Sequence, residues 1–203
     1  MLWFVKHFGQ TAVAAMGIAT RIEQIVLMPA IGLGTAMLSI VGQNYGAGLP
    51  RRLREAWIIN ICHGSAFMVA GGVLLWIFGE TAMRIFTDDP DVIRIGARYL
   101  KAAAISLSAY PILFVTVFMM QGLKRPGYGI WIGLYRQIAG PILAYHTLVI
   151  TLGWGLVGIW WGMLIVTWSA ALFAMWWGWK VCGRLVLGNF KADDPNHNGK
   201  KLS

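Results

Sequence analysis

Charged residues are scarce in this sequence, making up only 12% of its 203 residues. A soluble domain is typically about 25% charged, so the chain has too little polar surface to cover a globule in water. Its 58% hydrophobic content and mean hydropathy of +0.63 argue further against a soluble all-α protein. A transmembrane β-barrel is disfavoured as well, because barrel strands alternate polar and apolar residues whereas the apolar runs here are continuous.

Cysteine and acidic residues are also few. Cys62 and Cys182 are the only cysteines. They lie too far apart for a metal-binding spacing or a disulfide framework, so we expect packing roles and no metal site. Eight acidic against 17 basic residues give a net charge of +9. The basic residues lie between apolar runs, as in the cytoplasmic loops of membrane proteins, which does not indicate a nucleic-acid partner. No catalytic constellation is visible, so we do not expect an enzyme.

Five apolar runs dominate the chain, at residues 11–44, 56–78, 102–122, 128–152 and 156–181. Each is long enough to cross the hydrocarbon core, which takes about 20 residues of helix. The sequence therefore predicts an all-α, polytopic transmembrane helix bundle of about five full spans plus the end of a sixth. Pro111 predicts a kink in the third run, and the amphipathic stretch 91–101 predicts a helix at the membrane interface.

The basic clusters mark alternate connections, after the first, third and fifth runs. Positive charge favours the cytoplasmic side, which predicts an outside N-terminus and a cytoplasmic C-terminus. Residues 188–203 are predicted to be a polar, disordered cytoplasmic tail. Residues 1–10 are interpreted as the end of a truncated upstream helix and a loop, because an outside N-terminus with no evident signal peptide indicates missing upstream sequence.

A specific pattern occupies residues 14–48. It consists of Arg21, Glu23, Pro29, Gly32 and Gly34, followed by Gly42-Gln43-Asn44-Tyr45-Gly46-Ala47-Gly48. It resembles the eighth of the twelve helices of multidrug and toxic compound extrusion (MATE) transporters. Residues 86–89, followed by Tyr99 and Leu100, resemble the family's connection into its tenth helix. Residues 121–124 resemble the cytoplasmic end of that helix.

The resemblance implies that residues 11–187 form the C-terminal lobe of a two-lobed transporter. Such a protein would be a multi-pass antiporter of a bacterial inner membrane that exchanges Na⁺ or H⁺ for small organic cations in multidrug efflux. Beyond this coupling ion no cofactor is implied. The implied partners are the lipid bilayer and either the missing N-terminal lobe or a second copy. Two alternatives stay open: a lipid-linked oligosaccharide flippase of the same superfamily, and a non-transporting membrane fragment or scaffold.

Ionisable residues at membrane depth are functional candidates, and here they are Arg21, Glu23 and Arg136. Two positions apart on a helix, Arg21 and Glu23 point to nearly opposite sides. Glu23 lies ~18 Å and Arg136 ~12 Å along their helices, near the middle of a ~30 Å core. We predict that they pair, with Gln24 and Gln137 as secondary partners. Proton or cation linkage and a purely structural pair both remain open roles.

A second set of residues is predicted to face a substrate cavity, where aromatic and methionine side chains suit lipophilic cations. Helix packing or lipid contact is the alternative. Some family branches place a cation-binding acid on the tenth helix, but residues 102–122 contain no Asp or Glu, so the coupling ion is not assigned. The cavity candidates are Gln24, Tyr110, Met119, Met120, Gln121 and Gln137.

Overall fold

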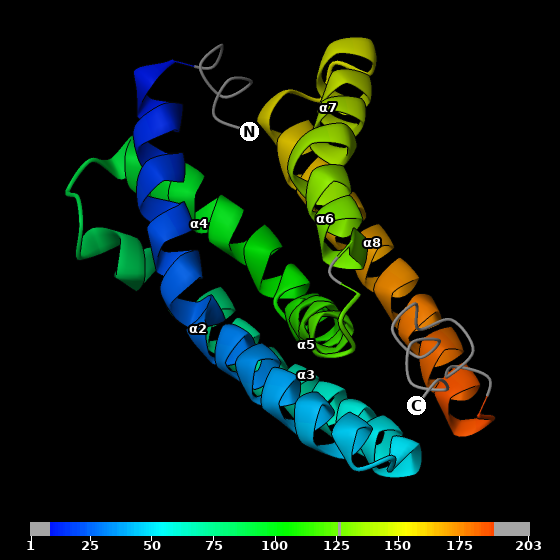
Figure 1. Cartoon of the computed structure of the whole chain (residues 1–203). Helices are drawn as coiled ribbons and strands as arrows, with labels where there is room; N and C mark the ends of the chain where they lie inside the picture. Colours follow the sequence, from blue (N-terminus) through cyan, green and yellow to red (C-terminus); the bar gives the residue numbers. More distant parts are fainter. Residues whose placement is uncertain (1–8, 126, 189–203) are drawn as a thin grey trace, which may run out of the picture.

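The computed structural model describes residues 9–188 except residue 126, and all regular secondary structure in this part is helical. Most of the predicted N-terminal segment 1–10 and almost all of the predicted tail 188–203 lie outside the described residues. Figure 1 shows an elongated bundle. Its α-helices and two π-helices (η) are, in chain order, α2 (Gln10–Gly46), α3 (Pro50–Arg84), α4 (Pro90–Ser106), α5 (Ala109–Gly122), α6 (Gly127–Leu134), η2 (Tyr135–Ala139), α7 (Gly140–Tyr145), η3 (His146–Thr151) and α8 (Gly155–Val186).

Three of these helices are individually long and apolar enough to cross a membrane. They are α2 with 37 residues, α3 with 35 and α8 with 32. At 1.5 Å per residue α2 is about 55 Å long, which exceeds a ~30 Å hydrocarbon core and requires tilt or protrusion. The pair α4–α5, bent by 54°, passes the same test together. The predicted all-α transmembrane bundle is confirmed.

The predicted span 128–152 takes a more complex form than one α-helix. Residues 127–151 stay helical throughout, but α6 and α7 alternate with the π-helical turns η2 and η3. None of these four pieces reaches the length of a span by itself. Together they form one rod alongside α8 (Figure 1).

The boundary between the predicted interfacial helix (91–101) and the predicted third span (102–122) lies later in the chain than expected. A single helix, α4, runs from Pro90 to Ser106, and the break follows at residues 107–108. The Asp89 carboxylate caps its start by accepting the backbone N–H groups of Asp91 and Val92, with Pro90 at the first helical position. The chain bends three residues before Pro111, whose ring removes a backbone donor.

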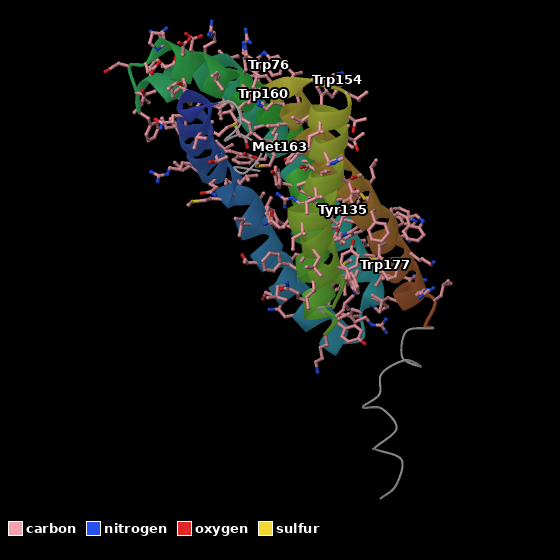
Figure 2. The ribbon with its side chains drawn as sticks, turned by 90° about the horizontal axis from the view of Figure 1, so that it is seen from above. Trp76, Tyr135, Trp154, Trp160, Met163 and Trp177 are labelled. Carbon is pink, nitrogen blue, oxygen red and sulfur yellow. The ribbon has the colours of Figure 1, made fainter. Side chains whose placement is uncertain are left out.

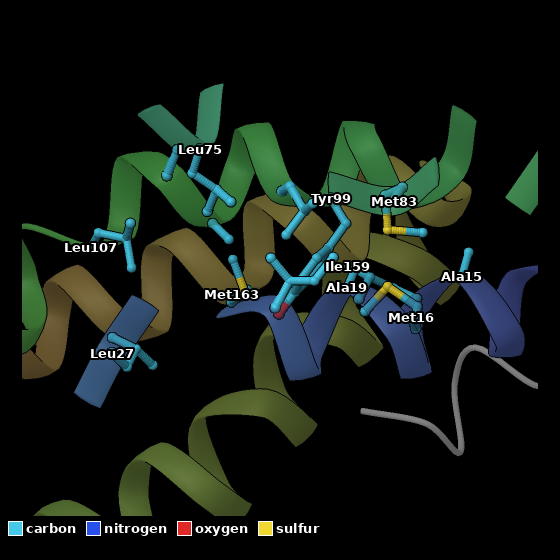
Figure 3. Packing of buried hydrophobic residues seen from close by; sticks show 14 of the residues in the cluster. Ala15, Met16, Ala19, Leu27, Leu75, Met83, Tyr99, Leu107, Ile159 and Met163 are labelled. Carbon is cyan, nitrogen blue, oxygen red and sulfur yellow. The ribbon is translucent and has the colours of Figure 1, made fainter. Parts of the chain in front are cut away.

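Two clusters of the core lie toward opposite ends of the bundle, and a smaller third cluster joins α5, α6 and α8 around Leu113 and Ile132. The Trp57 half packs where α2 ends, α3 begins and α5 and α8 end, with Met37, Trp57, Met119 and Cys182 among its buried residues. The Glu23 half lies toward the other end of the bundle and is made by α2, α3, α4, the start of α5, α7 and α8. Figure 3 shows part of its packing. Its buried hydrophobic residues include Met16, Ile22, Leu75, Met83, Tyr99, Leu100, Tyr110, Tyr145, Ile159 and Met163.

Tryptophans lie toward both ends of the bundle. Figure 2 places Trp154 and Trp160 toward one end and Trp177 toward the other. Trp154 and Trp161 are about half exposed at one end of α8, and Trp176 and Trp179 are about half exposed at the other. Their amphipathic rings suit the two membrane–water interfaces, so this distribution marks the boundaries of the hydrocarbon core.

Candidate functional site

Glu23 is the one charged residue that the described part of the chain buries, with 6% of its surface exposed. It falls on the inward row of α2, which also contains Ala12, Ala19 and Ala30. The Tyr110 hydroxyl donates to its Oε1 at 3.0 Å, and the Tyr99 hydroxyl donates to its Oε2. A buried carboxylate is costly unless it is hydrogen-bonded. Both of its oxygens are bonded here.

The bend between α4 and α5 brings the two tyrosines to one carboxylate. Tyr99 is on α4 and Tyr110 is on α5, and both are almost fully buried. Pro111 has no N–H to offer the Leu107 carbonyl, which instead accepts the Tyr110 backbone N–H at 3.2 Å. Figure 3 shows Tyr99 reaching from α4 toward α2. The hydroxyls therefore approach Glu23 from opposite sides of a 54° bend.

A π-helical turn carries Arg136 to the same place. Its guanidinium carbon lies 4.6 Å from the centroid of the Tyr110 ring, a distance typical of a cation–π contact. Pro141, one turn later, cannot donate to the Gln137 carbonyl, and the Gly140 N–H bonds to the Tyr135 carbonyl five residues back. The proline thus accounts for the π turn, a feature often found at functional sites.

The predicted direct pairing of Glu23 with Arg136 needs correction. The ion pairs within the described residues join Arg84 to Glu80 and Arg94 to Asp91, and Glu23 is in neither. Tyr110 connects the two groups instead: its hydroxyl donates to the carboxylate and its ring faces the guanidinium. The sequence placed both groups at a similar depth but held no information on the ring between them.

The other predicted polar residues of the site lie on the surface. Arg21 and Gln24 are exposed on α2, and Gln137 is exposed next to the half-buried Arg136. Arg21 and Glu23 thus differ in burial, as their spacing on one helix predicts. The side-chain hydrogen bonds of Glu23 come from Tyr99 and Tyr110, so the role of the two glutamines as secondary partners stays a prediction.

The predicted cavity residues separate into two groups. Met119 and Met120 are almost completely buried in the Trp57 half, where the Cys182 thiol contacts the Met119 sulfur at 3.7 Å. They pack within the lobe and face no open space. Tyr110 belongs to the Glu23 site, and Gln121 is exposed at the end of α5. Gln121, like Gln24 and Gln137, remains available to a neighbouring lobe.

Sequence reasoning missed Tyr99 as a site residue, and it did not single out Tyr145 nearby. Tyr99 lies on the buried face of the amphipathic stretch, in the row Val92, Gly96, Tyr99 and Ala103. That helical spacing was the available signal, since it directs a hydroxyl into the bundle. Tyr145 is buried in the same cluster, and its ring lies where a side chain at Gly162 would clash. No sequence pattern pointed to it.

A family model described as MatE matches residues 1–146, which is more than half of the chain. The chain belongs to the MATE family. It is 28% identical over 182 residues to the probable multidrug resistance protein YpnP of Bacillus subtilis, covering 87% of this chain and 40% of that protein. It is 30% identical over 187 residues to the probable multidrug resistance protein NorM of Pseudomonas putida, covering 89% and 40%.

The fold agrees with MATE transporter structures. A crystal structure of MATE in the bent conformation superposes with a TM-score of 0.83 at 22% identity, over 89% of this chain and 40% of that chain. The chain thus spans about 40% of the length of the relatives it matches. It is a multi-pass membrane protein with the fold of part of a MATE transporter.

Chemically, the Glu23 site combines one buried carboxylate, two buried hydroxyl donors and one nearby guanidinium. A carboxylate in such surroundings can bind or release a proton, or bind a cation, as the surrounding groups move. Within residues 9–188, leaving out 126, no group of three His, Cys, Asp or Glu side chains gathers closely enough to hold a metal ion.

Proposed function

We propose that this chain forms the C-terminal lobe of an ion-coupled exporter of small organic compounds, and that Glu23 links ion binding to transport. The observation that carries the proposal is the burial of one carboxylate, 6% exposed, between hydroxyls from the two arms of a broken helix. Ionisable groups inside membranes mark ion pathways, and broken helices commonly form the binding sites of secondary transporters. The multidrug resistance relatives support the export of organic compounds.

The two hydrogen bonds to Glu23 couple its charge to the angle between α4 and α5, because one comes from each helix. While Glu23 is ionised, Tyr99 on α4 and Tyr110 on α5 both donate to it and hold the 54° bend closed. Hydrogen bonds to a charged acceptor are about twice as strong as neutral ones. Neutralising Glu23 with a proton or Na⁺ weakens both bonds together, which frees α4 and α5 to change their angle. Arg136 on the Tyr110 ring moves with α5.

The arrangement of the basic connections supports the proposed orientation. The ends of α2, α5 and α8 all contribute to the Trp57 half. The basic side chains at Arg52, Lys124 and Arg184 therefore belong to one end of the bundle. By the positive-inside tendency we assign that end to the cytoplasm and the described N-terminal end to the outside. The bacterial relatives support a bacterial inner membrane.

Transport is proposed to need a second lobe, because alternating access moves one bundle against another around a central site. The part of the MATE architecture that this chain does not span, or a second copy, would supply it. The relatives that match are described as multidrug resistance proteins, which does not favour the flippase alternative. A folded chimera without dye efflux would favour the remaining alternative, a non-transporting membrane scaffold.

A chimera tests the proposal. This chain replaces the matching 182-residue region of YpnP, and the purified protein is placed in vesicles loaded with ethidium. We expect efflux driven by a pH gradient or by a Na⁺ gradient, applied separately so that the coupling ion is identified. This chain alone, in the same vesicles, is expected to give none.

The decisive variant is Glu23→Gln, which keeps the shape and removes the charge. We expect it to abolish gradient-driven efflux, whereas Glu55→Gln, the same change at an exposed position on α3, leaves it intact. A well-folded chimera that moves no dye with either gradient contradicts the exporter assignment. Unchanged efflux in Glu23→Gln contradicts the role of Glu23 alone.

A further inference from the structure

A groove between α3 and α4 changes from charged to apolar along its length. Near the α3–α4 connection lies a cavity of about 460 Å³, lined by Glu80, Arg84, Asp88, Pro90, Ile93, Arg94, Ala97, Arg98 and Lys101. Closer to the middle of the same helix pair lies a second cavity of about 460 Å³, lined by Val69, Gly72, Val73, Trp76, Ile77, Ala104, Ile105 and Ser108. Neither cavity belongs to the Glu23 site.

The two cavities lie on one continuous face. On α3 the lining residues Val69, Val73, Trp76, Glu80 and Arg84 follow one another at intervals of three or four residues, the spacing of one helix face. They run from the apolar cavity to the charged one. Along α3, the apolar lining residues therefore come before the charged ones, which lie next to the α3–α4 connection.

The lining residues of α4 show the same spacing in the opposite chain direction. Arg94, Arg98, Lys101 and Ile105 on α4 succeed one another at intervals of three or four, and Ser108 follows in the break after α4. The two helices are joined by a short connection at residues 85–89, so their charged ends meet there. Charged cavity and apolar cavity therefore form one groove with a single polarity gradient.

The charged end contains two basic side chains that form no ion pair within the described chain, together with the unpaired carboxylate of Asp88. Its lining contains four basic and two acidic side chains. Arg84 is paired with Glu80 at 2.8 Å and Arg94 with Asp91 at 2.7 Å. The ion pairs found within the described chain leave Arg98 and Lys101 without an acidic partner. Two free cations at the rim of the membrane can attract an anionic headgroup.

The apolar end is a shallow trough built on a close helix contact. A Cβ at Gly72 would lie 2.8 Å from the Ala104 carbonyl oxygen, so the glycine lets the two backbones approach and forms the floor. Val73, Trp76 and Ile105 are each about half exposed along it. Figure 2 places Trp76 toward the end of the bundle where Trp154 also lies, a typical position for an indole at the glycerol level of a lipid.

We propose that this groove binds one anionic phospholipid, with its phosphate at Arg98 and Lys101 and an acyl chain along the trough from Trp76 to Ser108. The polarity gradient matches a lipid in direction: the charged end lies at a helix connection, where a bilayer has its headgroups, and the apolar end lies deeper. A soluble anion would use the charged end only. A neutral lipid would use the trough only.

The test is native mass spectrometry of the purified chain in detergent, titrated with phosphatidylglycerol or phosphatidylcholine. We expect the first phosphatidylglycerol to bind more tightly than the first phosphatidylcholine. In the variant R98A/K101A, about fivefold should be lost per charge removed, or about 25-fold in all, for phosphatidylglycerol, with a smaller loss for phosphatidylcholine, whose choline cation offsets its phosphate. The control R51A/R52A removes two exposed cations from the other end of α3 and should keep the selectivity.

Two further measurements decide whether the groove binds a whole phospholipid or only a soluble anion. Val73→Trp fills the trough at an exposed position and should weaken the binding of both lipids, which a headgroup-only site would not show. Millimolar inorganic phosphate should not displace phosphatidylglycerol. Equal loss of selectivity in both double variants overturns the proposal. Displacement by phosphate overturns it as well, since it assigns the charged end to a soluble anion. Neither result bears on Glu23.

Discussion

The Trp57 half and the Glu23 half share α2, α3, α5 and α8 but differ in the side chains that fill them. The Trp57 half is packed by apolar side chains, with Trp57 donating its indole N–H to the Thr116 hydroxyl at 3.1 Å. The Glu23 half encloses a carboxylate and three buried tyrosines, and both proline-linked irregularities, the α4–α5 bend and η2, lie beside it. One half is therefore built as a stable frame, and the other concentrates the polar groups and the irregular backbone.

This contrast has a physical basis in the membrane. Regular helices satisfy their own backbone groups, whereas a broken helix must find partners in neighbouring protein. The interruption near Pro111 is buried beside α2, whereas the π turn before Pro141 has no buried residue of its own and contacts α8 through the buried Gly140. Such positions also bring side chains from several segments to one point, which the Glu23 site requires.

The largest loss in the free energy of unfolding is expected from a substitution in the Trp57 half. Trp57→Ala removes a fully buried indole and leaves the Thr116 hydroxyl unbonded, so we expect a loss of about 3–5 kcal/mol in the free energy of unfolding. Titration with SDS, followed by circular dichroism, measures it. Trp161→Ala, at a half-exposed position on α8, should change stability by less than about 1 kcal/mol. Equal losses would remove the distinction between frame and surface.

A smaller effect is expected at the polar site. Tyr99→Phe deletes a hydrogen bond to the Glu23 carboxylate, and bonds to charged groups contribute about 1.5–3 kcal/mol. The control is Tyr128→Phe, because the buried Tyr128 hydroxyl makes no hydrogen bond within the described residues. That variant should be neutral or slightly stabilising in the same SDS titration. A Tyr99→Phe loss no greater than the control's would mean that Glu23 is not held by Tyr99.

Gly140 tests the π turn in the Glu23 half. A Cβ there would lie 2.7 Å from a Val166 methyl group on α8 and 2.9 Å from the Tyr135 carbonyl oxygen. Overpacking of this kind costs about 1–3 kcal/mol, so we expect Gly140→Ala to destabilise the bundle by about 1–2 kcal/mol. Gly32→Ala, where a Cβ would meet nothing within 4 Å, should be neutral or stabilising. If both behave alike, η2 does not depend on close contact with α8.

The smallest effect concerns Arg136. Pro141→Ala restores a backbone N–H, allows η2 to become α-helical and so rotates Arg136 away from Tyr110. A cation–π contact contributes about 0.5–2 kcal/mol. In a double-mutant cycle, Arg136→Ala should therefore cost about 1 kcal/mol in the natural background and almost nothing in Pro141→Ala. An equal cost in both backgrounds would show that the proline does not position Arg136.

Much of the fold was predictable because the bilayer imposes simple rules on sequence. Long apolar runs predicted the helices α2, α3 and α8, and the two-residue spacing of Arg21 and Glu23 predicted that they point to nearly opposite sides of α2; the structure has Glu23 buried and Arg21 exposed. Pro111 predicted a kink, and the structure has one. The extent of α4 was not predicted, since its polar first turns and apolar last turns look like separate segments when only hydropathy is considered.

The amino-acid order determined which segments enter the membrane, because hydropathy and proline positions act locally along the chain. Only the packed structure decided what Glu23 binds. Its partners Tyr99 and Tyr110 lie 76 and 87 positions away, and Tyr110 lies between it and Arg136. Depth in the membrane can be counted along a helix, but the rotation and crossing of helices depend on how all of their side chains fit together.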